Sequence, residues 1–242
     1  MRILCVILVS LLMMSLPSYA STAQKDTVTV ITQWLPQAQF AGIIMAYEKG
    51  FYEEAGIEAE IKYAQESVSS IDMLENGEAD IITSMLVDAM VATEYNEYFQ
   101  IMMAGIDIGE GNIIRLRDEG YDIPEDGIYT TEQYYSSHKD VVDRFVRATV
   151  RGWEWVRNPD NLEETVDTIT GIMRRMNIPA SKVNQKYMLK TVLRLQEDST
   201  GHVPYRLDPS RFDFTVRMLR ESNFILETID YDDFVHTPDT DS

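Results

Sequence analysis

The residue types that carry most enzyme chemistry are few and scattered in this 242-residue chain. The three histidines, His138, His202 and His236, are far apart in the sequence, and the one cysteine, Cys5, lies among the first twenty residues. No glycine-rich loop ending in Lys-Ser or Lys-Thr, which would cradle a phosphate, is present. The sequence therefore predicts no catalytic residue, no metal ligand and no cofactor.

Aromatic and acidic side chains are the stronger candidates for chemistry. Trp34 and Tyr95 each offer a flat face on which a ring can stack. Glu97 can accept hydrogen bonds from an amine or pair with a protonated ring. Trp34 and Glu97 also have an ordinary structural interpretation, because large aromatic residues are commonly core and glutamates on helices are commonly solvated.

The elements that must position Trp34 follow from the hydrophobic pattern. Apolar and β-branched residues predict strands at 27–31, 57–63 and 79–85, and helical spacing predicts helices over 40–51, with Tyr47 facing inward, and over 68–76. This order predicts a parallel βαβαβ sheet with right-handed crossovers. Ligands bind beyond the carboxyl ends of such strands, so the turn at Gln33 and Trp34 is expected at the binding rim.

The second half of the chain is mostly helical. One amphipathic helix is expected over 139–157, and three more over 162–176, 181–196 and 209–222. Ser181 and Asp208 are the expected N-caps of the last two. The acidic end from Asp230 is expected to fray.

Charge and the first twenty residues indicate where the protein works. The formal net charge of −19 argues against nucleic acid as a partner, because such surfaces need clustered Lys and Arg. Residues 1–20 have the pattern of a secretory signal peptide, with an apolar run too short to span a bilayer, so cleavage before Ser21 is expected. The mature chain would be an acidic, cysteine-free periplasmic protein with no membrane insertion.

Several motifs resemble the periplasmic binding proteins of the alkanesulfonate-binding and thiamine-pyrimidine-synthase-like type. Residues 74–80 look like the family's landmark before the third strand, and Tyr95-Asn96-Glu97-Tyr98 and 124–129 are similar to its thiamine-pyrimidine-precursor-binding branch. The opening of the family is matched by Trp34-Leu35-Pro36, Phe40-Ala41-Gly42, Ala46, Lys49-Gly50-Phe51-Tyr52 and Gly56-Ile57. The resemblance implies a type II α/β fold with a parallel sheet flanked by helices, and a small ligand clamped between two lobes.

The resemblance also implies a site for a flat heteroaromatic ligand such as an aminopyrimidine, with a ring face for stacking and polar groups at the ring edge. Phe40 has core packing as its stronger interpretation, and residues 124–127 also fit an acidic surface turn. The implied ligand-binding residues are Trp34, Phe40, Tyr95, Asn96, Glu97, Glu125, Asp126 and Tyr129.

The chain departs from the family between its third strand and the Tyr95 motif. Intact relatives have on the order of 80 to 100 residues there, a domain's worth, whereas only 14 residues separate Asp80 from Tyr95. We expect an internal deletion that leaves the first lobe nearly complete and the second truncated. The expected parts are a signal peptide (1–20) and one domain (21–242), which contains lobe I (27–86), a lobe II remnant (87–126), a helical return to lobe I (127–230) and an acidic tail (231–242).

The expected function is the substrate-binding component of an ABC transporter, working as a monomer with a membrane permease. The alternatives are a sensory ligand-binding protein, a pyrimidine synthase or a remnant that binds nothing. The synthase resemblance would require a lysine and a histidine where this chain has Ser84 and Asp88. A sulfonate or nitrate carrier fits poorly, because anion capture favours Arg or Lys at helix N-termini and the motifs here are acidic and aromatic.

Overall fold

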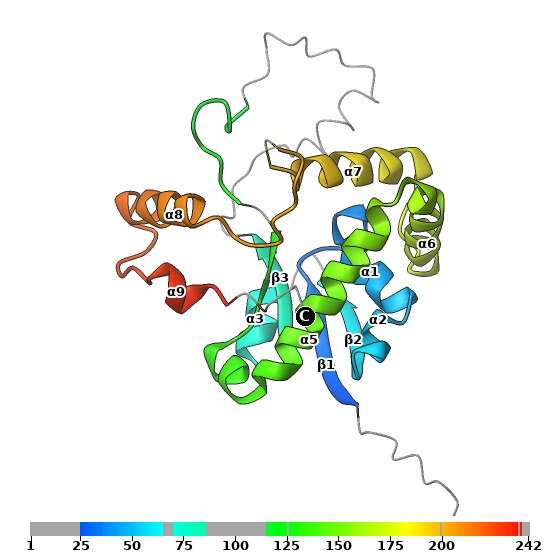
Figure 1. Ribbon diagram of the computed structural model, residues 1–242, viewed down its shortest axis with the longest axis horizontal. Helices are drawn as coiled ribbons and strands as arrows, with labels where there is room; N and C mark the ends of the chain where they lie inside the picture. The colour runs from blue at the N-terminus through cyan, green and yellow to red at the C-terminus, as the bar shows by residue number, and fades with distance from the viewer. Residues whose placement is uncertain are drawn as a thin grey trace, which may run out of the picture.

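A four-stranded sheet with helices on both faces forms the centre of the molecule (Figure 1). The computed structural model describes residues 25–64, 70–85, 115–124, 126–198, 200–236 and 238. The strands are β1 (Asp26–Thr32), β2 (Ile57–Tyr63), β3 (Ile81–Met85) and β4 (Asp126–Tyr129), in the order β2-β1-β3-β4. The three strands predicted from the sequence are present.

The sheet is mixed, which corrects the expectation of a purely parallel sheet. β1 pairs in parallel with β2 and β3, whereas β4 runs antiparallel to β3, with Met85 opposite Asp126 and Ile82 opposite Tyr129. The pattern missed β4 because 126–129 is a four-residue strand whose sequence has the composition of a turn. Its direction places Asp126 beside the carboxyl end of β3.

The helix predicted over 40–51 is divided into three pieces. A short 3-10 helix, η1 (Ala38–Phe40), leads into α1 (Ala41–Glu48), and α2 (Phe51–Glu54) follows. The break is at Gly50, whose φ of 74° favours glycine. Tyr47, which the helical spacing placed inward, is 51% exposed. The helix after β2 is α3 (Ser70–Glu75).

The four later helices occur close to their expected positions. They are α5 (Glu132–Arg157), α6 (Leu162–Arg175), which follows the 3-10 helix η3 (Pro159–Asn161), α7 (Lys182–Leu195) and α8 (Pro209–Glu221). Both expected N-caps are confirmed: the side chain of Ser181 accepts the backbone N–H of Asn184, and that of Asp208 accepts two backbone N–H groups. The α5 helix begins seven residues earlier than expected, at a cap from Thr131, and bends at His138.

The C-terminal part contains a further helix, α9 (Tyr231–Phe234), where the sequence suggested a fraying tail. Aromatic contacts hold it, because the rings of Tyr231 and Phe234 lie 5.5 and 5.3 Å from the ring of Phe212 on α8. In the described part of the chain, no helix combines the length and apolar character that crossing a bilayer requires.

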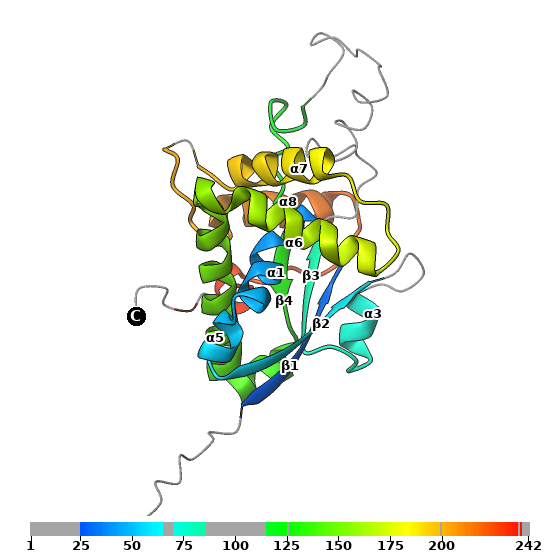
Figure 2. The same cartoon turned by 90° about the vertical axis from the view of Figure 1, so that its right-hand side faces the viewer.

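The helices cover the two faces of the sheet unequally. Figure 2 shows α1 and α5 on one side and α3 on the other. Val28, Val30 and Ile81 point to the α1 and α5 side, where they are buried with Phe145 of α5. Ile31 and Ile82 point to the α3 side. The helices of the larger layer approach closely through Gly152, whose position leaves 2.1 Å between an added Cβ and the carbonyl oxygen of Gly42.

Candidate functional site

Trp34 lies at the carboxyl end of β1, where ligands of such sheets gather. Two hydrogen bonds set the turn that carries it: the backbone N–H of Gln33 donates to Thr83 Oγ1 (2.9 Å), and the hydroxyl of Thr32 donates to the carbonyl of Trp34 (2.8 Å). Trp34 is 44% exposed as a residue. The interpretation of Trp34 as a core residue is therefore wrong, and its ring has a free face.

Asp126 is linked by hydrogen bonds to Gln33, the residue before Trp34, and to further side-chain amides. Its carboxylate accepts hydrogen bonds from Gln33 Nε2 at 2.7 Å and from Gln39 Nε2 at 3.4 Å. Gln39 in turn accepts one from Gln37 Nε2 at 2.5 Å. Thus the end of β1, the start of β4 and the η1 turn are linked at one edge of the sheet.

A pocket of about 480 Å³ opens beside the indole of Trp34. The other lining residues come from the N-cap of η1, the end of α6, the connection that follows it and the start of α7. They are Gln37, Met173, Pro179, Ala180, Ser181, Asn184 and Gln185. The backbone N–H of Ala38 donates to Gln185 Oε1 at 2.9 Å and so joins α7 to η1.

The predicted site residues do not all lie in the same place. Trp34 and Asp126 share the rim described above. Phe40 is 2% exposed and packs in the core with residues of α1, α6 and α7, in agreement with its core interpretation. Tyr95, Asn96, Glu97 and Glu125 fall outside the residues that the structure describes.

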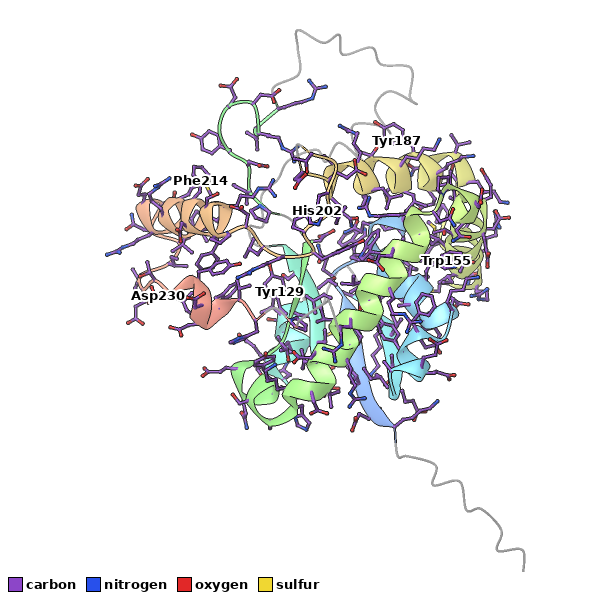
Figure 3. The ribbon with its side chains drawn as sticks, viewed as in Figure 1. Tyr129, Trp155, Tyr187, His202, Phe214 and Asp230 are labelled. Atoms are coloured by element: carbon purple, nitrogen blue, oxygen red, sulfur yellow. The ribbon has the colours of Figure 1, made fainter. Side chains whose placement is uncertain are left out.

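Tyr129 lies at the opposite end of β4 from Asp126, with its ring 6.2 Å from Phe234 of α9 and folded back over Gly127 (Figure 3). Burial, and then the charge of Asp126, raises the pKa of Tyr129 to about 12. Its hydroxyl is therefore protonated at neutral pH. Ser84, beside Gly127 in the β3–β4 register, is half-buried, and Asp88 lies outside the described residues.

No pattern in the sequence indicates Asn184 and Gln185 as site residues. They are about 150 positions from Trp34, and amides on an amphipathic helix are usually solvated. Only the packing of α7 on η1 brings them to the rim. The described residues include no cluster of three or more His, Cys, Asp or Glu side chains that could hold a metal ion.

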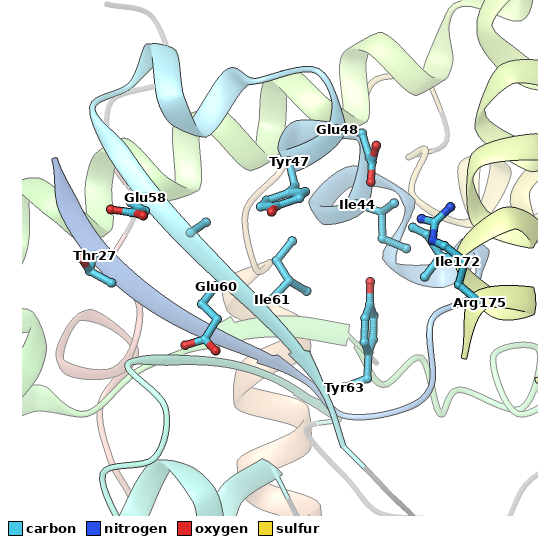
Figure 4. A pocket seen from close by; sticks show the side chains of 11 residues that line it. Thr27, Ile44, Tyr47, Glu48, Glu58, Glu60, Ile61, Tyr63, Ile172 and Arg175 are labelled. Atoms are coloured by element: carbon cyan, nitrogen blue, oxygen red, sulfur yellow. The ribbon is translucent and has the colours of Figure 1, made fainter. Parts of the chain in front are cut away.

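A second groove, of about 540 Å³, runs along β2 beneath α1 and α6 (Figure 4). It shares no lining residue with the pocket at Trp34. Tyr47, Tyr63 and Ile61 contribute apolar surface, while Glu48 and Arg175 lie at one end. The pKa of Tyr63 is raised to about 12 by burial and then by the charge of Glu48, partly offset by Arg175. This groove lies along an edge strand, away from the residues that the sequence predicted.

Comparison with known families gives two matches to the profile described as NMT1/THI5 like, over residues 37–86 and 82–162. Together they span just over half of the chain, and they meet at the end of β3. No curated protein matches the sequence significantly.

Solved structures resemble the chain in fold. The Candida albicans CA3427 gene product, described as having the generic periplasmic binding protein fold, is 13% identical, with a TM-score of 0.52 over 84% of this chain and 92% of that one. A putative sulfonate-binding protein SsuA from Methylobacillus flagellatus is 10% identical, with a TM-score of 0.52 over 88% of this chain and 92% of that one. A zinc-bound ligand-binding component of an ABC-type import system from Staphylococcus aureus is 12% identical, with a TM-score of 0.54 over 88% of this chain and 97% of that one. At these identities the likeness establishes the fold, which is that of periplasmic binding proteins.

Proposed function

Because the chain belongs to the NMT1/THI5-like family, we propose that it is the solute-binding component of an ABC importer and that it binds a thiamine pyrimidine precursor or a similar flat heterocycle. It works in the periplasm after removal of residues 1–20, and as a monomer it delivers its ligand to a membrane permease. The periplasmic binding protein fold supports this role.

The exposed indole of Trp34 is the observation that carries the proposal. An aromatic residue that is 44% exposed at the carboxyl end of a central strand, on the wall of a 480 Å³ pocket, is suited to stacking against a flat ligand. Asp126, held by two glutamine amides at the same rim, supplies an acceptor. Tyr95, Asn96, Glu97, Glu125 and Tyr129 complete the proposed set.

An internal deletion after β3 is part of the same proposal. The two profile matches meet at residues 82–86, next to the short interval between Asp80 and Tyr95. A clamp without most of one lobe buries less of its ligand and leaves the hydrogen bonds between protein and ligand more exposed to water. Its affinity is therefore micromolar or weaker. The proposed lobe boundaries remain 27–86, 87–126 and 127–230.

The proposal predicts that this chain does not catalyse pyrimidine synthesis. That synthesis needs a lysine where Ser84 stands, to form a Schiff base with pyridoxal phosphate. Incubation with pyridoxal phosphate should give no Schiff-base absorbance. A stable band that disappears when one lysine is replaced would contradict this part of the proposal.

Calorimetric titration tests the binding function. Purified protein is titrated with an aminomethylpyrimidine precursor, thiamine and riboflavin, with a sulfonate as the negative control. Heat from the pyrimidine alone, at micromolar concentrations, is the expected result. Saturable binding of the sulfonate but not of any heterocycle would overturn the proposal.

A further inference from the structure

The pocket beside Trp34 is uncharged, although the whole chain carries a net charge of −19. Of the described residues that line it, none is acidic or basic: three are amides, and the apolar part comes from Met173, Pro179 and Ala180. An ion that enters such a pocket loses hydration without gaining a counter-charge. The lining therefore favours a neutral ligand.

Gln185 presents a hydrogen-bond donor whose identity is fixed by the backbone. The side chain is buried, and its Oε1 accepts the N–H of Ala38 at 2.9 Å. Because a backbone N–H can only donate, the oxygen of this amide must face Ala38 and the Nε2 group must be at the other position. No described residue accepts a hydrogen bond from Nε2, which leaves it for a ligand in the pocket.

Asn184, which also lines the pocket, can supply the complementary acceptor when its side chain turns toward a ligand. Its Oδ1 is buried and receives no hydrogen bond from the described part of the protein. The residue is held in the first turn of α7, where its own backbone N–H donates to Ser181 Oγ at 3.2 Å. A buried acceptor without a donor costs free energy. A ligand N–H that donates to this oxygen therefore gains more binding free energy than one that donates to an oxygen already hydrated by water.

We propose that Gln185 and Asn184 bind the amidine edge of a neutral aminopyrimidine whose ring lies against Trp34. The ring nitrogen accepts from Gln185 Nε2, and the exocyclic amine donates to Asn184 Oδ1. This inference rests on the proposed function, because it names how that same site selects its ligand. Recognition then comes from two neutral amides of α7 in addition to Asp126 at the rim.

A hydroxypyrimidine in which a hydroxyl group replaces the exocyclic amine of the same ring distinguishes this arrangement from simple stacking. In its keto form a ring N–H and a carbonyl replace the ring acceptor and the amine donor, so donor would meet donor at Gln185 and acceptor would meet acceptor at Asn184. Its flat shape and its stacking area are nearly unchanged. A site built to pair with donors and acceptors discriminates strongly between such analogues.

The test compares the two pyrimidines by calorimetry on the full mature chain and two variants. Wild type should bind the aminopyrimidine about tenfold or more tightly than the hydroxypyrimidine. Gln185→Glu keeps an oxygen for Ala38 but replaces the donor by an acceptor, so each pyrimidine then has one matched contact and the preference should fall toward equality. Asn184→Ala should reduce aminopyrimidine affinity and raise hydroxypyrimidine affinity, because it removes both the acceptor for the amine and the acceptor that opposes the carbonyl. Gln133→Glu, at an exposed position of α5, is the matched control and should retain the wild-type preference.

Each preference is a ratio measured on one protein sample, so a variant that folds incompletely still gives a valid ratio. If wild type binds both pyrimidines equally, and Gln185→Glu does not change the ratio, the amide recognition is wrong while the binding function stands. If wild type binds neither, the proposed function fails and this inference fails with it.

Discussion

The side-chain amide of Gln33, just after β1, donates a 2.7 Å hydrogen bond to the carboxylate of Asp126, the first residue of β4. The two residues are 93 positions apart; Gln33 follows β1 and Asp126 begins β4, and both of these strands pair with β3. This contact brings the residue just before the Trp34-Leu35-Pro36 motif and a residue of the 124–129 motif to one end of the sheet. It also gives the first prediction.

Asp126→Asn should lower the free energy of unfolding by about 0.5 to 1 kcal/mol, the usual net value of one hydrogen bond. Asparagine has a single side-chain acceptor, so Gln33 and Gln39 can no longer both donate to oxygen. Urea unfolding measures the change. The control is Asp213→Asn on the exposed face of α8, where we expect no measurable loss. Equal effects of the two substitutions would show that the Asp126 network has no structural role.

Gly152→Ala should destabilise the protein strongly, by roughly 3 kcal/mol, because its Cβ would lie 2.1 Å from the carbonyl oxygen of Gly42 and 2.9 Å from Ala46. Gly171→Ala is the matched control in α6, where the nearest atom is the flexible end of Arg175 at 3.6 Å. The control should stabilise the protein by up to about 1 kcal/mol through helix propensity. Thermal unfolding of both variants is the measurement. Similar melting temperatures would contradict the close contact of α1 and α5.

The pairing of Asp122 with Arg211 predicts a stability difference that depends on pH. Partial burial alone would raise the pKa of Asp122, but hydrogen bonds and charge from Arg211, together with Arg117, outweigh it and lower the pKa. A carboxyl whose pKa is lower in the folded state stabilises the fold above its unfolded pKa, about 3.9, and loses that contribution as pH falls through the folded pKa.

Asp122→Asn should therefore be less stable than wild type at neutral pH, with the difference shrinking below about pH 4. Urea unfolding at several pH values gives the comparison. Asp118→Asn, in the same segment and exposed, is the control for the removal of one carboxylate. A difference between Asp122→Asn and wild type that is constant with pH would contradict the ion pair.

Substitutions at the proposed site should weaken ligand binding. Trp34→Ala should cost roughly 1 to 3 kcal/mol of binding free energy, the scale of a buried aromatic anchor, and Glu97→Gln a similar amount. The control is Tyr47→Ala, which removes an aromatic ring of similar exposure that lines the groove along β2 instead. If Tyr47→Ala weakens binding and Trp34→Ala does not, the ligand site is the groove.

The deletion predicts that affinity can be recovered. Insertion of the corresponding domain-sized segment of an intact relative between Leu86 and Val87 should tighten pyrimidine binding, since a restored lobe buries more of the ligand. Calorimetry compares the two chains. Nanomolar binding by the natural chain as a monomer would show that the deletion argument is wrong.

Local patterns predicted much of the fold because local forces determine those parts. Alternation at 57–63 and the caps Ser181 and Asp208 depend on neighbours within a few residues, and all three occur as expected. The direction of β4 and the packing of Tyr231 against the ring of Phe212 depend on partners far along the chain, and neither was anticipated.

The same distinction applies to the candidate site. The position of Trp34 at the rim follows from the order of strands, which the sequence shows. The approach of Gln185 to Trp34 follows from how α7 packs on η1, through the hydrogen bond to Ala38. No spacing rule in the sequence reports that contact, so the amides in the pocket could be found only in the structure.

The most direct test of the central claim observes the three indole N–H groups of the chain by ¹H–¹⁵N NMR during titration with an aminopyrimidine. Single replacements of each tryptophan by phenylalanine assign the signals. The ligand should shift the Trp34 signal in a saturable manner and leave those of Trp153 and Trp155 nearly unchanged, because only Trp34 lines the pocket at the rim. An unmoved Trp34 signal at saturating ligand, or a larger shift at either of the other two, would contradict the account.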